Sequence, residues 1–316
     1  MKDLISISEK LLKDCLDLKA EETFLVVTDR LKREIGGALY HAGLHIGADA
    51  MLLEMKPRTR NGEEPPMPVA EAMISAKVTV CPTQYSLTHT QARKKAVEKG
   101  ARVATMPGIT EDMFAQGAIT ADYREVEELT NRMTEILSRG KEVRIVKGGR
   151  ELRFSIAGRK GVPSTGIYRK PGQSGNLPSG EAYIAPVEGT AEGKLLVDGS
   201  MVGIGLLKEP LEIAISAGKL DRVEGFHAKD FLKSLGTSEL ARNVAEFGIG
   251  TNRKARLTGI ILEDEKIYGT VHVAFGDNST FGGSVQAGIH LDGVILKPDV
   301  FVDDTKIMDK GEIIIP

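Results

Sequence analysis

The sequence predicts a mixed α/β protein, in which an N-terminal parallel αβα sheet domain precedes a C-terminal glycine-rich α+β domain. Three observations lead to this prediction. Strands and helices alternate through the first 140 residues. Short, closely spaced strands follow them, and nine of the 35 glycines precede residue 141 whereas 26 come after it. We therefore expect domains at residues 1–140 and 141–316, and we expect the second domain to carry the functional site.

The first domain is predicted from a regular alternation. Apolar residues recur at helical spacing from Leu4 to Leu16, and the apolar run at 23–28 is typical of a buried strand. A helical pattern from Gly37 to His45 follows. Further apolar runs lie at 50–53, 77–80 and 102–105. Continuous apolar strands between helices indicate a parallel sheet covered on both faces. The turns lack both glycine-rich phosphate-binding motifs, so a nucleotide site is not supported.

The second domain begins after a helical pattern at 122–139, which we interpret as the helix that links the two domains. Beyond this helix, short strands alternate with glycine turns, as in an antiparallel sheet. The expected strands include residues 143–146, 152–156, 195–197, 211–215 and 270–275.

Composition excludes several classes of partner. Lys and Arg number 42 against 44 acidic residues, Trp is absent and aromatic residues make up 5%. We therefore expect neither a nucleic-acid partner nor a membrane partner. The chain has two cysteines, Cys15 and Cys81, and both lie in apolar patterns that predict burial. With no sign of a leader peptide, this favours a reducing, cytoplasmic location.

Two histidines lie within apolar strand patterns. His290 and Asp292 alternate in the run 289–294 and would project from the same face of a strand, while His272 lies in the run 269–275. Buried polar groups are costly unless they are paired or bound to a cation. Two interpretations stay open: a two-histidine, one-carboxylate site for a transition metal, or buried histidines that Asp292 orients.

Two further carboxylates strengthen the metal interpretation. Glu181 follows the run 176–180, and Glu246 lies among apolar and glycine residues at 243–250. Each alone could cap a turn. Together with His272, His290 and Asp292, they offer enough ligands for two metal ions.

The segments 176–181, 245–250, 269–276 and 290–292, in this order, resemble the metal-site segments of the aminopeptidase T family. The resemblance implies two divalent ions (zinc, cobalt or manganese), release of N-terminal residues from peptides by a metal-activated water, and a homo-oligomer, at least a dimer. It also implies the ligands Glu181, Glu246, His272, His290 and Asp292, with Glu246 alternatively serving as the base. We expect a peptide or small-molecule substrate.

The chain is shorter than these peptidases, and Ser279 stands where they carry an active-site tyrosine, which makes it a candidate substrate-binding residue. The shorter relatives include 2,5-dihydroxypyridine 5,6-dioxygenases, which imply a single iron(II) held by His272, His290 and Asp292. A non-catalytic protein that retained the metal site is a third interpretation.

His89 lies in the segment 86–90, which resembles a substrate-contacting segment of these dioxygenases. We expect the metal site in a cleft between the domains, with His89 facing it as a catalytic proton donor or acceptor. The alternative is that Thr88 or Thr90 caps the helix at 91–99 and His89 only lies beside it.

Overall fold

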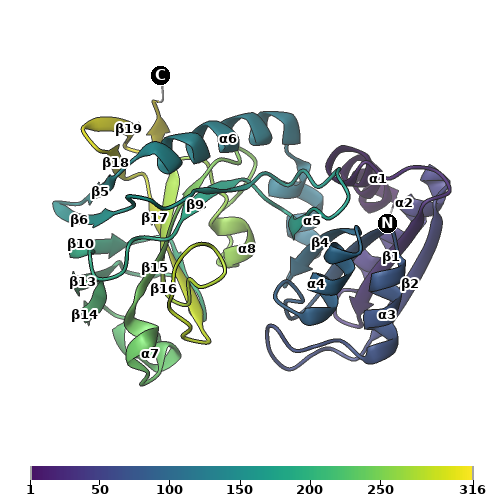
Figure 1. The fold of residues 1–316 in the computed structure, drawn as a ribbon, viewed down its shortest axis with the longest axis horizontal. Helices are drawn as coiled ribbons and strands as arrows, with labels where there is room; N and C mark the ends of the chain where they lie inside the picture. The colour runs from purple at the N-terminus through teal and green to yellow at the C-terminus, as the bar shows by residue number, and fades with distance from the viewer. Residues whose placement is uncertain (1, 315–316) are drawn as a thin grey trace. The chain divides into compact units, whose positions relative to one another are not determined.

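The computed structural model describes residues 2–314, which form two compact units (Figure 1). The first unit comprises Met1–Glu127 and Thr165–Ser179, and the second comprises Glu128–Ser164 and Gly180–Pro316. The division thus lies inside helix α6 (Tyr123–Arg139), which corresponds to the linking helix expected at 122–139. Residues 165–179, which we expected in the second domain, belong to the first unit because they contribute a strand to its sheet.

The first unit contains one five-stranded sheet, sheet A, whose strand order is β2-β1-β3-β4-β8. All of its neighbouring strands are parallel. The strands are β1 (Thr23–Asp29), β2 (Asp49–Met55), β3 (Val78–Thr83), β4 (Arg102–Pro107) and β8 (Ser174–Asn176).

Helices cover both faces of sheet A. Leu25 and Val27 pack with residues of α3 and α4, while Phe24 lies on the opposite face against Gly43 of α2. The Thr90 hydroxyl accepts the Arg93 N–H and caps α4. The helices are α1 (Lys2–Leu16), α2 (Arg33–Ile46), α3 (Met67–Ser75), α4 (Gln91–Glu98), α5 (Glu111–Gln116) and the 3₁₀ turn η1 (Ala118–Thr120).

The second unit is built from two antiparallel sheets. Sheet B has the order β14-β13-β10-β6-β5-β18-β19-β20, and sheet C has the order β12-β11-β17-β16-β15-β9-β7. The strands of sheet B are β5 (Glu142–Lys147), β6 (Arg150–Ser155), β10 (Glu192–Val197), β13 (Leu211–Ser216), β14 (Lys219–Glu224), β18 (Asp299–Val302), β19 (Thr305–Asp309) and β20 (Glu312–Ile313). The strands of sheet C are β7 (Val162–Ser164), β9 (Glu181–Ile184), β11 (Ser200–Met201), β12 (Gly205–Leu206), β15 (Val244–Gly250), β16 (Thr270–Gly276) and β17 (His290–Leu296).

The main core of this unit lies between sheets B and C. Phe154 of β6 contacts Phe247 of β15, with ring centroids 5.5 Å apart. Val273 and Ile295 join the same buried cluster. The helical elements are α7 (Ala228–Leu235), the 3₁₀ helix η2 (Glu239–Arg242) and α8 (Ile261–Asp264). The predicted fold class, a parallel αβα sheet followed by an antiparallel-rich α+β part, is confirmed.

Candidate metal centre

Sheet C carries the five predicted ligands on one face. Each of them lies opposite a glycine or alanine on a neighbouring strand, so that a large polar side chain is always beside a small one. The pairs are Glu181 with Gly250, Glu246 with Ala274, His272 with Gly248, His290 with Gly276 and Asp292 with Ala274. Because residues opposite one another share a face, the register aligns all five side chains. We call this surface the polar face of sheet C.

Strand alternation explains why these residues converge. Phe247, Val273 and Ile295 are fully buried in the core on the opposite face. Their neighbours in sequence must therefore point to the polar face. A β-carbon at Gly248 would lie 2.1 Å from Nε2 of His272, so only glycine leaves room for this imidazole. The strand pattern thus places the site as well as the core.

A loop at 252–268 adds two more charged groups to the polar face. The main chain at Ile267 lies close to Gly250. A β-carbon added at Gly250 would be 2.0 Å from the Ile267 carbonyl oxygen. The Asn252 N–H donates to the Lys266 carbonyl at 2.8 Å. Buried Asp264 accepts the N–H groups of Thr258 and Gly259. Glu265 and Lys266 are held at the site as a result.

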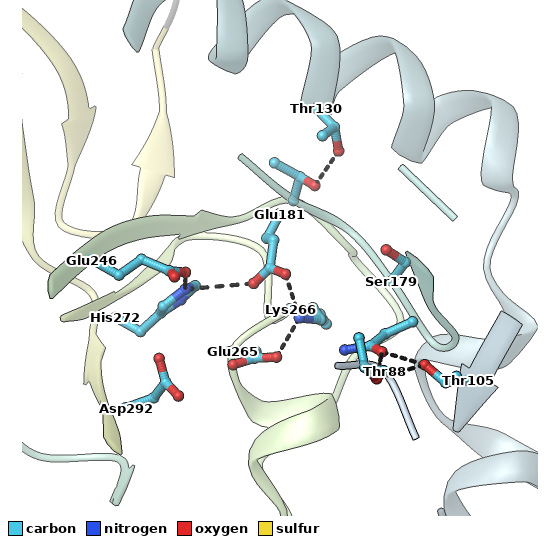
Figure 2. Close-up of polar contacts among 12 residues, drawn as sticks. Thr88, Thr105, Thr130, Ser179, Glu181, Glu246, Glu265, Lys266, His272 and Asp292 are labelled. Atoms are coloured by element: carbon cyan, nitrogen blue, oxygen red, sulfur yellow. Dashed lines mark hydrogen bonds and ion pairs between the residues drawn. The ribbon is translucent and has the colours of Figure 1, made fainter. Parts of the chain in front are cut away.

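His272 lies between two carboxylates (Figure 2). Its Nε2 atom is 3.3 Å from Oε1 of Glu246 and 3.4 Å from Oε2 of Glu181. The other oxygen of Glu181 accepts a hydrogen bond of 2.5 Å from Nζ of Lys266, which also donates to Glu265. A continuous series of polar contacts therefore joins five side chains, in the order Glu246, His272, Glu181, Lys266 and Glu265.

His290 belongs to a second group of ligands. Its Nδ1 atom lies 2.8 Å from the Asp277 carbonyl oxygen, which can only accept, so Nδ1 carries the proton. Its Nε2 atom lies 3.4 Å from both Oε2 of Glu246 and Oδ1 of Asp292. A carbonyl that orients the distal nitrogen of a histidine is a frequent feature of metal sites.

Burial and neighbouring charges shift the pKa values of these groups strongly. Burial raises the pKa of Glu246, but hydrogen bonds and charges from His272 and His290 outweigh it and hold the value at about 2. Burial lowers the pKa of His272, but the surrounding carboxylates raise it to about 9. Burial also raises the pKa of Glu265, to about 8. At pH 7, these values leave Glu246 ionised and His272 protonated.

The residues fit a divalent metal ion. Among the residues that the structure describes, two groups of three have donor atoms that all lie within 4.8 Å of one another: Glu246, His290 and Asp292, and Glu181, Glu265 and His272. Oδ1 of Asp292 and Oε2 of Glu181 are buried and accept no hydrogen bond. Buried carboxylate oxygens are normally satisfied, so these two atoms, beside imidazole nitrogen, indicate a place for a cation.

The structure brings together Glu181, Glu246, His272, His290 and Asp292 through a series of imidazole–carboxylate contacts. His272 contacts Glu246 as well as Glu181, and the expected iron triad of His272, His290 and Asp292 stays a prediction beside the two groups of donor atoms described above. Their roles as ligands stay predictions.

Two other predicted site residues belong to neither group of donor atoms. His89 is exposed and belongs to the first unit, and its position opposite the metal site stays a prediction. The hydroxyl of Ser279 donates to the Asp277 carboxylate at 2.8 Å.

Sequence reasoning missed Glu265 and Lys266. They lie in the run 263–266, where four consecutive charged residues have the appearance of an exposed loop. Glu263, Asp264 and Lys266 are nevertheless fully buried. The apolar residues on both sides, 260–262 and Ile267, were the available signal.

Two sequence comparisons lead to the same family. A family model described as 2,5-dihydroxypyridine 5,6-dioxygenase matches residues 3–315. A curated relative, 2,5-dihydroxypyridine 5,6-dioxygenase of Pseudomonas putida, is 25% identical over 189 residues, which cover 54% of this chain and 53% of the relative. The aligned region thus spans about half the length of that protein.

Two solved structures share the fold. The 2,5-dihydroxypyridine dioxygenase from Pseudomonas putida KT2440 has a TM-score of 0.84 at 18% identity, covering 99% of this chain and 97% of its own. AmpT from Thermus thermophilus has a TM-score of 0.73 at 17% identity, covering 99% of both chains. Both resemblances expected from the sequence are confirmed.

Proposed function

Since the chain belongs to the 2,5-dihydroxypyridine 5,6-dioxygenase family, a family of enzymes, we propose that it is a metal-dependent dioxygenase that opens a hydroxylated aromatic or N-heteroaromatic ring. The observation that carries this proposal is the group Glu246, His290 and Asp292. It offers one imidazole and two carboxylates on neighbouring strands, with an Asp292 oxygen that accepts no hydrogen bond.

These three side chains would hold the ion. When bound, iron(II) supplies the electron-transfer chemistry that allows dioxygen to react with an aromatic ring. The protein contributes orientation: the Asp277 carbonyl fixes the ring of His290, and Gly248 leaves room for His272 beside Glu246. The apolar core behind sheet C holds the strands, and hence the ligands, in fixed register.

A second candidate is the two-metal aminopeptidase predicted from the sequence. The second ligand group, Glu181, Glu265 and His272, and the fold shared with AmpT favour it. Two observations weigh against it. A serine stands where the peptidases carry a tyrosine, and its hydroxyl is bonded to Asp277. An engaged and shorter side chain is a poor substitute for a phenol that stabilises an oxyanion.

The two candidates predict different reactions. We propose to reconstitute the metal-free protein anaerobically with iron(II), add 2,5-dihydroxypyridine and measure oxygen uptake. The dioxygenase should consume one O₂ for each ring opened, and mass spectrometry after reaction in ¹⁸O₂ should find both oxygen atoms in the product. The aminopeptidase should instead hydrolyse aminoacyl anilides when loaded with zinc, cobalt or manganese, without oxygen. Absence of both activities in a metal-loaded protein would favour the non-catalytic metal-binding interpretation.

Among residues 2–314, no helix is both long and apolar enough to cross a membrane. A cytoplasmic location and a homo-oligomeric assembly are further parts of this proposal.

A further inference from the structure

Lys266 is a fully buried lysine within the candidate metal centre. Its ammonium group donates to Oε1 of Glu181 at 2.5 Å and also to Glu265. Glu181 and Glu265 are two of the three members of the second ligand group. The ammonium therefore lies between the same carboxylates that a second metal ion would need.

The backbone around Lys266 keeps the ammonium at this place. Its N–H donates to the Glu263 carbonyl at 2.9 Å, and its own carbonyl accepts the Asn252 N–H at 2.8 Å. The next residue, Ile267, packs against Gly250 of β15. Lys266 thus belongs to a packed segment, unlike a surface lysine whose side chain samples many rotamers.

The two ligand groups differ in what already compensates their charge. In the group Glu181, Glu265 and His272, the Lys266 ammonium bonds to both carboxylates (Figure 2). In the group Glu246, His290 and Asp292, the cationic groups that face the carboxylates in the described chain are imidazoles, that of His290 within the group and that of His272 beside Glu246. A buried carboxylate needs a counter-charge. The group Glu181, Glu265 and His272 has a permanent one, the Lys266 ammonium.

We propose that the Lys266 ammonium takes the place of a second metal ion, so that the centre binds one divalent ion, at Glu246, His290 and Asp292. The inference rests on the proposed metal centre and deepens it. An ammonium supplies charge and hydrogen bonds but no coordination positions for a substrate or a water. A centre of this composition suits one-metal chemistry and lacks the paired ions that clamp a hydrolytic water.

Metal stoichiometry tests this inference without an activity assay. The chelator-treated wild-type protein is incubated with excess Mn²⁺ or Zn²⁺, freed of unbound ion by gel filtration and analysed by elemental mass spectrometry. We expect one equivalent per chain. The variant Lys266→Ala removes the ammonium and leaves room for an ion, and we expect it to bind two. Lys266→Arg keeps the charge and should bind one.

Lys147→Ala is the matched control, because Lys147 lies in the same unit and pairs with Asp198 outside the site; it should also bind one equivalent. Two equivalents in the wild-type protein would overturn the inference, and this result does not depend on whether Lys266→Ala folds. A folded Lys266→Ala protein that still binds one ion would overturn it too. A wild-type protein that binds no ion would instead overturn the proposed function, and this inference with it.

Discussion

Sheet A of the first unit and sheet C of the second both bury their central strands, but they fill the two faces of those strands differently. In sheet A, Leu25 packs against the helices of one face and Phe24 against those of the other. In sheet C, Phe247 and Val273 fill one face only. The residues that alternate with them are carboxylates, imidazoles and glycines. A sheet covered by helices on both faces has little space for such groups, whereas one face of sheet C carries them beside Ala274 and Val294.

The buried carboxylates of the two sheets differ in the same way. Asp29, at the end of β1 in sheet A, accepts the backbone N–H groups of Leu31 and Gln84. In sheet C, one oxygen of Asp292 and one of Glu181 accept no hydrogen bond, and each lies 3.4 Å from an imidazole Nε2 atom. A buried acceptor without a donor destabilises the fold, and a bound cation removes this cost. The unsatisfied oxygens of Asp292 and Glu181 therefore favour a cation site on the polar face of sheet C.

The largest expected effect separates the two units directly. His290→Ala removes an imidazole from the group Glu246, His290 and Asp292. Loss of an outer-shell partner alone weakens metal binding by about 10- to 100-fold, so loss of a ligand should weaken it by at least that factor and abolish turnover. Metal content after gel filtration is the measurement. Hydrogen exchange in sheet A should not change.

The control for this variant is His45→Ala, which replaces an exposed histidine of the first unit and should bind metal like the wild type. Unchanged metal content in His290→Ala would show that His290 is not a ligand.

His89→Ala tests whether the first unit contributes to the chemistry. If His89 transfers a proton to or from the substrate, its removal should lower turnover by about 10²- to 10⁴-fold. The metal content should stay the same, because His89 belongs to neither ligand group. Metal content that is unchanged in His89→Ala but lost in His290→Ala would assign proton transfer to the first unit and metal binding to the second. Normal turnover in His89→Ala would reduce His89 to an exposed residue beside the capped helix α4.

The sequence predicted the parts of this architecture that follow from local periodicity. The parallel sheet, the antiparallel-rich second part and the helix near 122–139 all have regular apolar spacing. The alternation in β17 also placed His290 and Asp292 on one face. The return of residues 165–179 to the first unit is harder to predict from the sequence, because β8 joins sheet A by pairing with β4, which is distant in the sequence.

The candidate site was predictable where its residues lie in strands. Convergence of Glu181 and Glu246 depends on the long-range pairing of β9 with β15, for which the family resemblance supplied the signal. Lys266 and Glu265 could not be predicted, because their loop has no periodicity and is buried only by the close approach to Gly250. The contact of His272 with Glu181 likewise depends on side-chain geometry.

Two glycine-to-alanine substitutions, one in each unit, should change stability with opposite signs. Gly248→Ala would place a β-carbon 2.1 Å from His272 in the middle of sheet C. Overpacking of this kind costs about 1–3 kcal/mol, and displacement of His272 should also weaken metal binding. Gly37→Ala, in helix α2, meets no atom within 4 Å and should stabilise the protein by about 0.5–1 kcal/mol. Denaturant unfolding of both variants checks the signs. A neutral Gly248→Ala would mean that the imidazole of His272 has room to move.

At neutral pH, the smallest expected effect concerns the two thiols, which both lie in the first unit and so report on that unit alone. Burial raises the pKa of Cys81 from its ordinary 9.0 to about 12, and burial also raises the pKa of Cys15. Thiolate is the reactive form, so iodoacetamide should label neither cysteine at pH 8 until the first unit opens. Metal binding at sheet C should leave this labelling rate unchanged if the two units open independently.

The same shift predicts the alkaline stability of the first unit. Between pH 9 and about 12, the folded protein keeps the Cys81 proton while the unfolded chain loses it. The folded state then binds more protons, so its stability falls as pH rises, by up to about 1.4 kcal/mol per pH unit for each such thiol. Cys81→Ala removes this contribution, and its free energy of unfolding should decline less steeply above pH 9 than that of the wild type. Equal slopes would mean that the Cys81 thiol ionises near its ordinary pKa in the folded state, and that sheet A is less tightly closed than its apolar faces imply.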